Sequence, residues 1–430
     1  MNSVIEPIVP GTRIQSEPRS VNILLYLVYF TYFFCGMTQC FESVFLPEMK
    51  EYFRLNYQQQ MYVMFAKNIA FLFAVLVGAR VQRIGYKTCL AIAMALYAVG
   101  TLSLVPGLST GRYSLVLLAF VIIGSGFTIQ MVAGSPLIGA LGPPQGSSSR
   151  LNFGNALGAI AQIIAPATLT LIIPATVISV QGKLPYMQGI FIAFGLGLVV
   201  IAAATLLVKD VDIRQTLRQS SPSTAFSVKS VWNSKLLLGF VAIFLVLGTE
   251  ASLFGFFRNY LEDPAIAGLS AHQSERLFTV YFAVFALGRM TAAWIQKRLR
   301  PPVHLAFYLL AAMVCLLLVM FTKGSFAVIA VVSLGFFVSI FFPTLYSMAI
   351  ENMGDLTGQA SGILTLGFLG CAIAPVIQGK LADSIGLQSS YGIGLFGYLF
   401  ALLYVLRNWR IKNTGAAPAE IIGVDAAGNP

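Results

Sequence analysis

Residues 158–166 read GAIAQIIAP, and residues 367–375 read GFLGCAIAP. In each stretch the final proline follows an earlier proline, Pro136 in the first copy and Pro343 in the second, after 30 and 32 residues respectively. Small and apolar residues therefore recur at the same place in each half of the chain. This repeat predicts a protein built from two related halves.

The composition of the chain places both halves in a membrane. Apolar residues make up 57% of the sequence and charged residues only 10%, whereas a soluble domain carries about 25% charged residues. One transmembrane helix needs about 20 mostly apolar residues, so 430 residues can hold twelve spans with short connectors. We therefore predict an all-α membrane protein with twelve transmembrane helices in two pseudo-symmetric six-helix bundles.

Apolar runs, separated by charged residues, glycine or proline, give the predicted spans. In the first half they are residues 22–46, 58–80, 87–106, 113–141, 150–175 and 185–208. In the second half they are residues 235–257, 275–296, 303–322, 325–350, 357–381 and 389–407. The predicted domains are an N-terminal tail (1–21), a first bundle (22–208), a linker (209–234), a second bundle (235–408) and a C-terminal tail (409–430). The first tail is polar and leads straight into a full-length span, so we expect no cleavable signal.

The distribution of lysine and arginine predicts the orientation. With the N-terminus in the cytoplasm, the inner connectors and tails carry 17 of the 27 basic residues and the outer connectors carry 8. Basic residues concentrate in the cytoplasmic loops of membrane proteins. We therefore expect a bacterial inner-membrane protein with both termini and the basic linker in the cytoplasm. The net charge of +11 is explained by these loops, so we expect no nucleic-acid partner.

A loop signature follows the second predicted span. Residues 78–87 read GARVQRIGYK, which resembles the loop motif Gly-x-x-x-Asp-Arg-x-Gly-x-Lys of the major facilitator superfamily. Gln82 stands where the acid of the motif is expected, which weakens the charge network of this gate but leaves its glycine-dependent turn. An ordinary basic inner loop remains the alternative. The candidate gating residues are Gly78, Arg83, Gly85 and Lys87. The resemblance implies a substrate site between the two halves and alternating access.

A closer resemblance covers most of the chain. Several stretches resemble the fucose/galactose/glucose:proton symporter family, which implies proton-coupled transport with a sugar as cargo. The matching stretches are FLPEMKEYFRL (45–55), LGP (141–143), RLNF (150–153), GTEA (248–251), GLSA (268–271), GRM (288–290), FPTLYS (342–347) and GKLADSIG (379–386). One scaffold can carry many cargoes, so these stretches indicate the family more than the substrate.

The chain departs from this family at positions that handle sugar and protons. The acid of the fucose permease's first span falls on Ser43, with Glu42 one residue earlier. The acid of its fourth span falls on Met131, beside Gln130. Its sugar-contacting asparagine falls on Gly158. The resemblance therefore implies the fold, while the proton relay and the identity of the sugar stay open.

Four charged residues lie at least four residues from either end of a predicted span, and a charge costs about 2.5–3.5 kcal/mol at a span centre. Glu250 in the seventh span is a candidate for proton coupling and substrate binding, or else part of a structural pair. Glu42 is a second proton-coupling candidate, although it lies near enough to the outer end to snorkel. Lys67 either neutralises Glu42 or binds an anionic substrate. Arg289 matches the resembled family, which suggests a structural role.

Amide side chains supply further candidates for substrate binding. Gln39 shares a face of the first span with Glu42, and Asn155 and Gln162 share a face of the fifth. Gln130 adds an amide from the fourth span. Each amide offers a donor and an acceptor, which suits a hydroxyl-rich solute. Hydrogen bonding between neighbouring helices is the alternative for each of them.

These features predict a proton-coupled secondary transporter of a small polar organic solute, which we expect to be a monosaccharide or a sugar derivative. Lys67 supports an alternative, a transporter or exporter of an anionic metabolite, a siderophore-like compound or a drug. A nutrient sensor on a transporter fold is the non-transport alternative. The two histidines, His272 and His304, lie in predicted connectors, and the spacing of the five cysteines suits neither zinc nor disulfides. We expect no enzymatic activity, metal or cofactor, and a monomer whose partners are its substrate, protons and the lipid bilayer.

Overall fold

The computed structural model of the chain describes residues 18–142, 147–174, 176–177, 179–208, 234–296, 298–351 and 357–415. These residues form helices at each of the twelve predicted spans, and no strand occurs among them. Within this described part of the chain, ten helical stretches are long and apolar enough to cross a membrane. The predicted all-helical membrane fold is confirmed.

Both halves contain long helices interrupted by short ones. The first half consists of α1 (Pro18–Val44), α2 (Leu46–Tyr52), α3 (Tyr57–Asn68), the 3-10 helix η1 (Ile69–Phe73), α4 (Ala74–Ile84), α5 (Tyr86–Ser109), α6 (Tyr113–Ala140), α7 (Ser147–Ile172) and α8 (Val180–Leu207). The second half consists of α11 (Ser234–Glu262), α12 (Ala271–Ile295), α13 (Pro301–Phe321), α14 (Gly324–Val338), α15 (Phe341–Ile350), α16 (Thr357–Thr365), the 3-10 helix η4 (Leu366–Leu369), α17 (Gly370–Ile385), α18 (Leu387–Ser390) and α19 (Gly392–Gly415).

Local sequence explains several helix boundaries. Asn56 begins α3 by accepting the backbone N–H of Gln59, and the Gln59 side chain accepts the N–H of Asn56 in return, which forms a capping box. Ser270 and Gln273 make the same arrangement at the start of α12. Gly85 has φ of 99°, a left-handed conformation that glycine tolerates. This glycine allows α4 to end and α5 to begin without an intervening loop.

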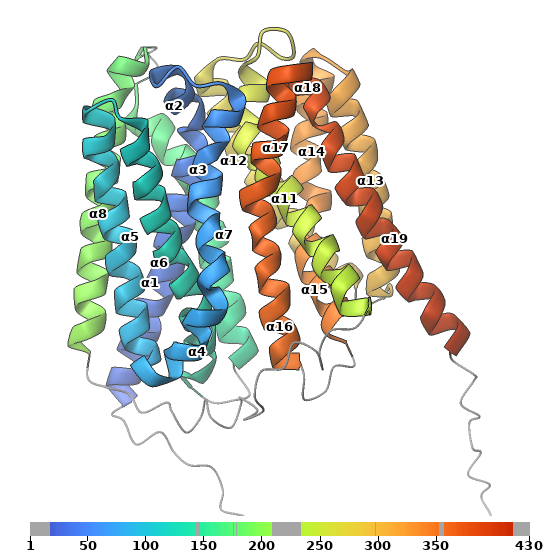
Figure 1. The fold of residues 1–430 in the computed structure, drawn as a ribbon, viewed down its shortest axis with the longest axis horizontal. Coiled ribbons are helices and arrows are strands. Elements are labelled where there is room, and N and C mark those ends of the chain that lie inside the picture. Colours follow the sequence, from blue (N-terminus) through green and yellow to red (C-terminus); the bar gives the residue numbers. More distant parts are fainter. Residues whose placement is uncertain are drawn as a thin grey trace, which may run out of the picture.

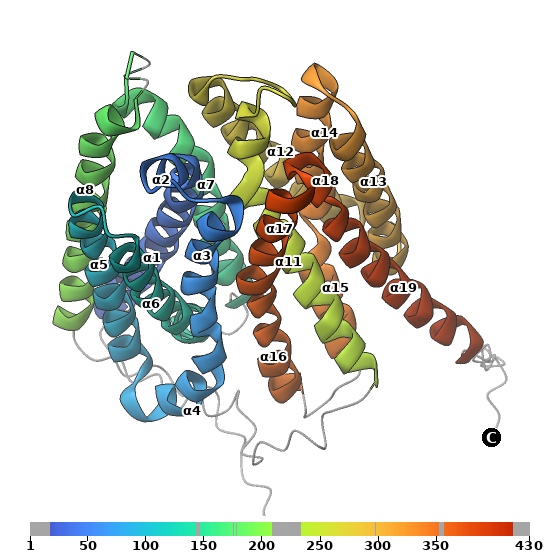
Figure 2. The ribbon, with the colours of Figure 1, turned by 45° about the horizontal axis from the view of Figure 1, so that its top comes forward.

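The helices of each half lie together on one side of the molecule (Figure 1). Helices α1–α8 form the blue-to-green side and α11–α19 the yellow-to-red side, and a second view shows the same separation (Figure 2). The main contacts between the two sides join α3 to α17 and α7 to α12. Following the predicted orientation, we call the edge with α2 and α18 the outer face and the edge with α4 and α16 the inner face.

Three spans are broken near the middle of the molecule. The second span changes from α3 to α4 through η1, and the eleventh changes from α16 to α17 through η4. The tenth span is interrupted between α14 and α15. The two 3-10 helices contact each other across the halves, where the rings of Phe71 and Phe368 stack with centroids 5.1 Å apart. A 3-10 stretch inside a helix often marks a hinge.

The two faces differ in how the halves meet. On the outer face, α2, α3 and α17 contact the opposite half. The inner elements α4, α15 and α16 make their substantial contacts, among the described residues, within their own half. The structure is therefore closed on the outer face and separated on the inner face, which in the predicted orientation is an inward-facing arrangement.

Candidate functional site

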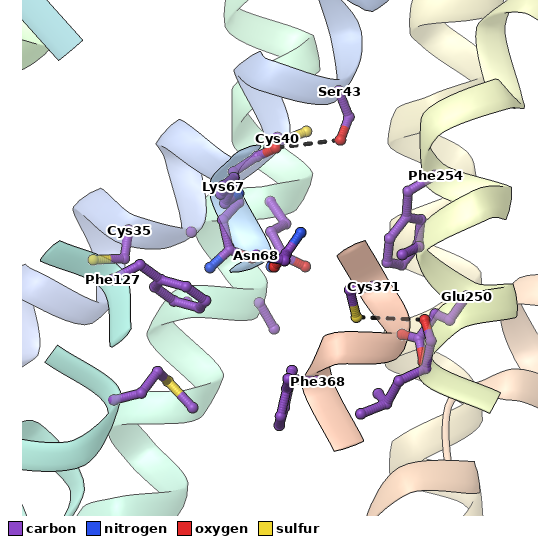
Figure 3. A pocket seen from close by; sticks show the side chains of 18 of the residues that line it. Cys35, Cys40, Ser43, Lys67, Asn68, Phe127, Glu250, Phe254, Phe368 and Cys371 are labelled. Carbon is purple, nitrogen blue, oxygen red and sulfur yellow. Dashed lines mark hydrogen bonds between the residues drawn. The ribbon is translucent and has the colours of Figure 1, made fainter. Parts of the chain in front are cut away.

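A cavity of about 290 Å³ lies between the two halves. Its lining comes from α1, α3, α6 and α7 of the first half and from α11, α12, η4 and α17 of the second (Figure 3). All six predicted substrate-binding residues line it: Gln39, Lys67, Gln130, Asn155, Gln162 and Glu250. The chain thus brings together side chains that are more than 200 residues apart in sequence.

Lys67 and Glu42 form an ion pair on adjacent helices. The ammonium group of Lys67 donates a hydrogen bond to Oε2 of Glu42, and only 8% and 1% of the two side chains are exposed. The Lys67 ammonium also lies 5.7 Å from the centre of the Phe127 ring. Lys67 borders the cavity, whereas Glu42 lies behind it. The positive charge of Lys67 is therefore neutralised in this conformation.

The amides around the cavity differ in burial. Gln130 on α6 is 1% exposed, and neither amide atom of its side chain has a hydrogen-bond partner within the described part of the chain. Asn155 on α7 is exposed and Gln162 is half-buried. A buried polar group without a partner is costly. A hydroxyl-rich solute in the cavity would provide the missing partners of Gln130.

The second half contributes an acid and a base. Glu250 on α11 and Arg289 on α12 both line the cavity and interact electrostatically with each other. Nε of Arg289 donates to the carbonyl oxygen of Ser339 at 3.0 Å, where the tenth span is broken. The Arg289 guanidinium also lies 4.6 Å from the centre of the Phe285 ring. Arg289 therefore connects the cavity to the break between α14 and α15.

Sequence reasoning missed part of this lining. Arg289 was predicted as structural, although a charge inside a span is a functional candidate by default, and the structure places it at the cavity as well. Phenylalanines are the other omission, because apolar side chains inside a span give no signal that separates the cavity from the lipid. The phenylalanines of the lining are Phe127, Phe254, Phe282, Phe285 and Phe368.

The predicted gating loop lies apart from the cavity, at the inner face. Gly78 and Arg83 are exposed on α4, and Gly85 makes the turn into α5. The ammonium group of Lys87 donates to the carbonyl oxygen of Val208 at 2.8 Å. This contact ties the start of α5 to the end of α8, within the first half.

The outer end of the cavity is closed by contacts between the halves. The backbone N–H groups of Tyr57 and Gln58, at the start of α3, donate to the two carboxylate oxygens of Asp383 at 2.8 and 2.9 Å. The Gln60 amide donates to the side-chain oxygen of Asn259 at 2.8 Å. An acid of α17 thus binds the N-terminus of a helix in the other half, where the helix dipole favours negative charge.

The described residues offer no site for a metal ion, since no group of three or more potential ligand side chains comes together among them. The five cysteines are free. Cys35, Cys40 and Cys371 line the cavity.

Comparison with known proteins gives one consistent picture. The profile described as Major Facilitator Superfamily matches residues 28–375 and 263–421. The glucose/galactose transporter of Brucella abortus (strain 9-941) is 30% identical over 396 residues, which cover 91% of this chain and 95% of that protein. The L-fucose-proton symporter of Escherichia coli (strain K12) is 24% identical over 422 residues, which cover 92% and 94% of the two chains.

Solved structures share the fold. The crystal structure of the E. coli fucose:proton symporter has a TM-score of 0.62 and 22% identity, and the match covers 91% of this chain and 99% of that one. A bacterial homologue of the human lysosomal transporter Spinster, in an inward-facing and occupied conformation, has a TM-score of 0.71 and 13% identity, with coverage of 94% and 100%. The predicted major facilitator fold is confirmed.

Proposed function

Because the chain belongs to the Major Facilitator Superfamily, we propose that it is a proton-coupled secondary transporter of a monosaccharide or close derivative that works by alternating access. The superfamily consists of transporters and not of enzymes. Relatives named as a glucose/galactose transporter and an L-fucose-proton symporter, aligned over nine-tenths of the chain, support a sugar as substrate.

The ion pair between Lys67 and Glu42 is the observation on which we choose between a neutral and an anionic substrate. The alternative of an anionic metabolite, siderophore-like compound or drug depended on Lys67 as a free cation. In the structure Glu42 already neutralises that cation, and Arg289 interacts electrostatically with the acid Glu250. While Glu250 is ionised, the charged groups described around the cavity therefore balance, which favours a neutral solute.

Amides and aromatic rings provide the groups that a sugar needs. Gln39, Gln130, Asn155 and Gln162 present donors and acceptors to hydroxyl groups. The buried and unpartnered Gln130 contributes most in this proposal, because a bound hydroxyl group removes the cost of its desolvation. The phenylalanine rings of the second half can stack on the apolar face of a sugar ring.

Glu250 is the proton carrier in this proposal. Its side chain borders the cavity, so a proton can reach it from whichever side the cavity faces. Low dielectric surroundings favour the neutral carboxyl group, which allows Glu250 to load and release a proton. Glu42 is held by Lys67 and is 1% exposed, which suits a positioning role and leaves it as the second candidate.

The proposal includes the placement of the protein in the cell. It acts as a monomer in the bacterial inner membrane, with bundles at 22–208 and 235–408 and with the linker 209–234 and both termini in the cytoplasm. The loop of Gly78, Arg83, Gly85 and Lys87 then gates the cytoplasmic side.

Uptake by proteoliposomes tests this function. The purified chain is reconstituted and given glucose, galactose and fucose, and separately a panel of organic acids, with an imposed pH gradient. We expect accumulation of at least one neutral sugar, abolished by a protonophore, and counterflow of the same sugar without a gradient. Accumulation of organic anions alone would overturn the sugar proposal.

A further inference from the structure

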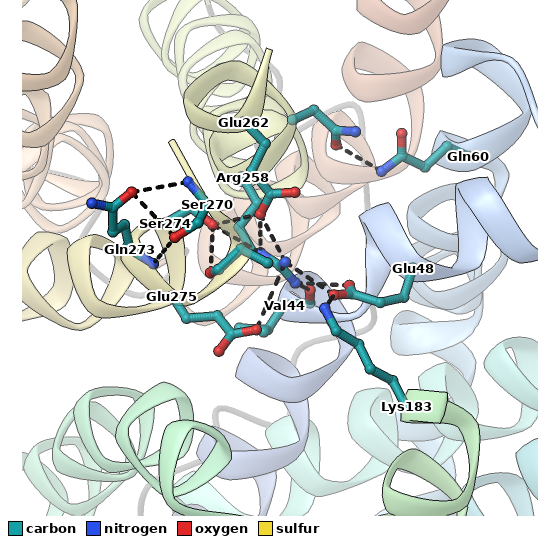
Figure 4. Close-up of polar contacts among 12 residues, drawn as sticks. Val44, Glu48, Gln60, Lys183, Arg258, Glu262, Ser270, Gln273, Ser274 and Glu275 are labelled. Atoms are coloured by element: carbon teal, nitrogen blue, oxygen red, sulfur yellow. Dashed lines mark hydrogen bonds and ion pairs between the residues drawn. The ribbon is translucent and has the colours of Figure 1, made fainter. Parts of the chain in front are cut away.

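A second cluster of buried charges lies between the halves at the outer face, away from the cavity lining (Figure 4). The cluster comprises Glu48 on α2, Lys183 on α8, Arg258 and Glu262 on α11, and Glu275 on α12. The mechanism proposed above does not use any of these residues.

Arg258 is the link between the two halves. Its side chain is 2% exposed, and its Nη1 and Nη2 atoms lie 2.7 and 3.0 Å from the two carboxylate oxygens of Glu48. Nη1 also donates to the carbonyl oxygen of Val44. The ammonium group of Lys183 lies 2.8 Å from Oε1 of Glu48. Glu48 is therefore paired with Arg258 across the interface and with Lys183 within its own half.

The other two acids share Arg258 on the side of the second half. Nη2 and Nε of Arg258 lie 2.7 and 2.8 Å from Glu262, which also accepts the hydroxyl group of Ser274. Glu275 lies farther away, with its carboxylate 3.7 Å from Nη2 of Arg258. Among the described residues no hydrogen bond reaches that carboxylate. Glu275 is the least satisfied acid of the cluster.

The charges of the cluster do not balance. Three carboxylates face two cations, so the closed interface holds one excess negative charge. The charged groups that act on Glu275 are Arg258, Glu48, Lys183 and Glu262. Helices α7 and α14 also pack against α12, but their sequences contain one charged residue, Arg150, at the inner end of α7. Arg276 and Lys323 lie at the same face but are exposed to solvent.

We propose that this cluster is a proton-binding site in which Glu275 takes up one proton as the outer gate closes. The proposal rests on the function proposed above and adds a second proton site to it. A buried carboxylate without a full counter-charge is costly, and one proton removes that cost. When the halves separate on the outer face, water solvates the same carboxylate. The proton therefore binds the closed gate better than the open gate, and outside acid shifts the population toward the closed, inward-facing state.

Protonation of Glu48 has the opposite effect to protonation of Glu275, because it favours the open outer gate, and it occurs in a different pH range. Although burial opposes it, pairing with Arg258 and Lys183 holds the pKa of Glu48 below its usual range. Its pairs thus favour the closed gate at all pH values above the usual pKa of glutamate, about 4.3. They are lost as the pH falls below that value. Between about pH 4.3 and neutral pH, the ion pairs of Glu48 stay intact. Proton uptake by Glu275 then determines the response to pH, so acid closes the outer gate.

Native cysteines allow this to be measured on the full chain. Cys35, Cys40 and Cys371 line the cavity, so an impermeant, positively charged methanethiosulfonate outside right-side-out vesicles reaches them through an open outer gate. Labelling rates are compared at pH 5.5 and pH 8 for the wild type, for Glu275→Gln and for Glu51→Gln. Glu51 is an exposed acid on α2 and serves as the matched control. Dividing the labelling rate of each variant by the wild-type rate at the same pH removes the intrinsic pH dependence of the thiol reaction.

We expect Glu275→Gln, which resembles the protonated state, to be labelled about fivefold more slowly than the wild type at pH 8 and equally at pH 5.5, since one proton changes an equilibrium by at most about tenfold per pH unit. Glu51→Gln should match the wild type throughout. A ratio that does not change with pH, or the same behaviour in both variants, overturns the proposal.

Lys183→Met gives a second test if Glu275→Gln does not fold. Removal of a cation raises the excess negative charge, so this variant should be labelled faster than the wild type at pH 8 and approach it at pH 5.5. Slower labelling at pH 8 contradicts the proposal. No sugar is present in the labelling assay. It can therefore contradict the proton site while sugar uptake still succeeds, and it can support the proton site while sugar uptake fails.

Discussion

The charged side chains around the cavity are arranged as acid and base on neighbouring helices. Glu42 and Lys67 stand on the first and second spans, and Glu250 and Arg289 stand on the seventh and eighth, which are the corresponding spans of the second half. A charge in hydrocarbon is tolerated when it is paired or reaches a water-filled cavity. Pairing explains how the charges of Glu42 and Lys67 are tolerated, and access to the cavity explains how those of Glu250 and Arg289 are tolerated.

Lys67→Met tests the role of the first pair. Without its partner, Glu42 is a buried charge with no counter-charge, a loss of about 3–5 kcal/mol. We expect a large fall in the thermal stability of the purified protein and in uptake. Lys67→Met combined with Glu42→Gln removes both charges and should recover part of the stability. If the double variant is no better than the single one, Lys67 binds an anionic substrate instead.

Glu250→Gln tests the proton carrier. An amide cannot load a proton, so accumulation driven by a pH gradient should be lost, while sugar binding and sugar exchange should stay near the wild-type level. Glu250→Ala should lose binding as well. The measurements are uptake with and without a gradient and counterflow of labelled sugar. Full accumulation by the Gln variant would transfer the coupling role to Glu42.

At the residue scale, the sequence identified the charged and amide residues, but it left the partner of Lys67 open between Glu42 and an anionic substrate. Glu250, Lys67 and the amides stood out because polar groups inside spans are costly. Whether Lys67 meets Glu42 depends on how two helices are rotated about their own axes, which hydropathy does not define. Arg258 and Glu275 were missed because they lie near the outer ends of spans, where a charge is ordinary.

Each predicted span corresponds to one helix or to a broken run of helices. The ends differ from the prediction by at most five residues, except that α19 continues to Gly415, eight residues beyond the predicted end at 407. The breaks inside spans were not predicted, because the apolar pattern continues through η1, η4 and the junction of α14 with α15. At the break of the tenth span the carbonyl oxygen of Ser339 accepts a hydrogen bond from Arg289, whose side chain lines the cavity. Irregular backbone at membrane depth is tolerated where it is buried in protein or borders a cavity.

The outer closure yields a prediction for the contact of α17 with α3. In Asp383→Asn, an amide with one acceptor oxygen replaces a carboxylate that accepts the N–H groups of both Tyr57 and Gln58. A capping contact of this kind contributes about 0.5–2 kcal/mol, and here it joins the two halves. We expect outside thiol labelling of the cavity cysteines to rise several-fold at pH 8.

The control for this variant is Asn56→Ala. Asn56 caps the same helix from within its own half, so its loss should lower stability without raising outside labelling. Equal labelling of both variants would show that Asp383 stabilises α3 only and does not hold the gate.

At the scale of the whole molecule, the internal repeat was the decisive feature. It predicted two related halves, and the twelve helical positions and the superfamily match agree with it. The difference between the faces was not predictable, because a repeat alone does not say which of two alternating states is adopted. That choice depends on contacts such as Asp383 with α3 and Arg258 with Glu48, whose partners lie in opposite halves.

The orientation of the molecule is open to a direct test. Basic residues concentrate in the connectors that we place in the cytoplasm, and the described ends of α1 and α19 lie at the same edge as α4 (Figure 1). An even number of spans puts both chain ends on one side. We therefore expect reporter fusions at Ser220, which lies outside the described residues, and at the C-terminal tail to be cytoplasmic. A fusion after Gly111, in the connector between α5 and α6, should be periplasmic and serves as the control. A periplasmic signal at only one of these two sites would contradict the span count. Periplasmic signals at both, with a cytoplasmic signal at Gly111, would invert the orientation and place the Arg258 cluster on the cytoplasmic side, where outside acid could not reach it.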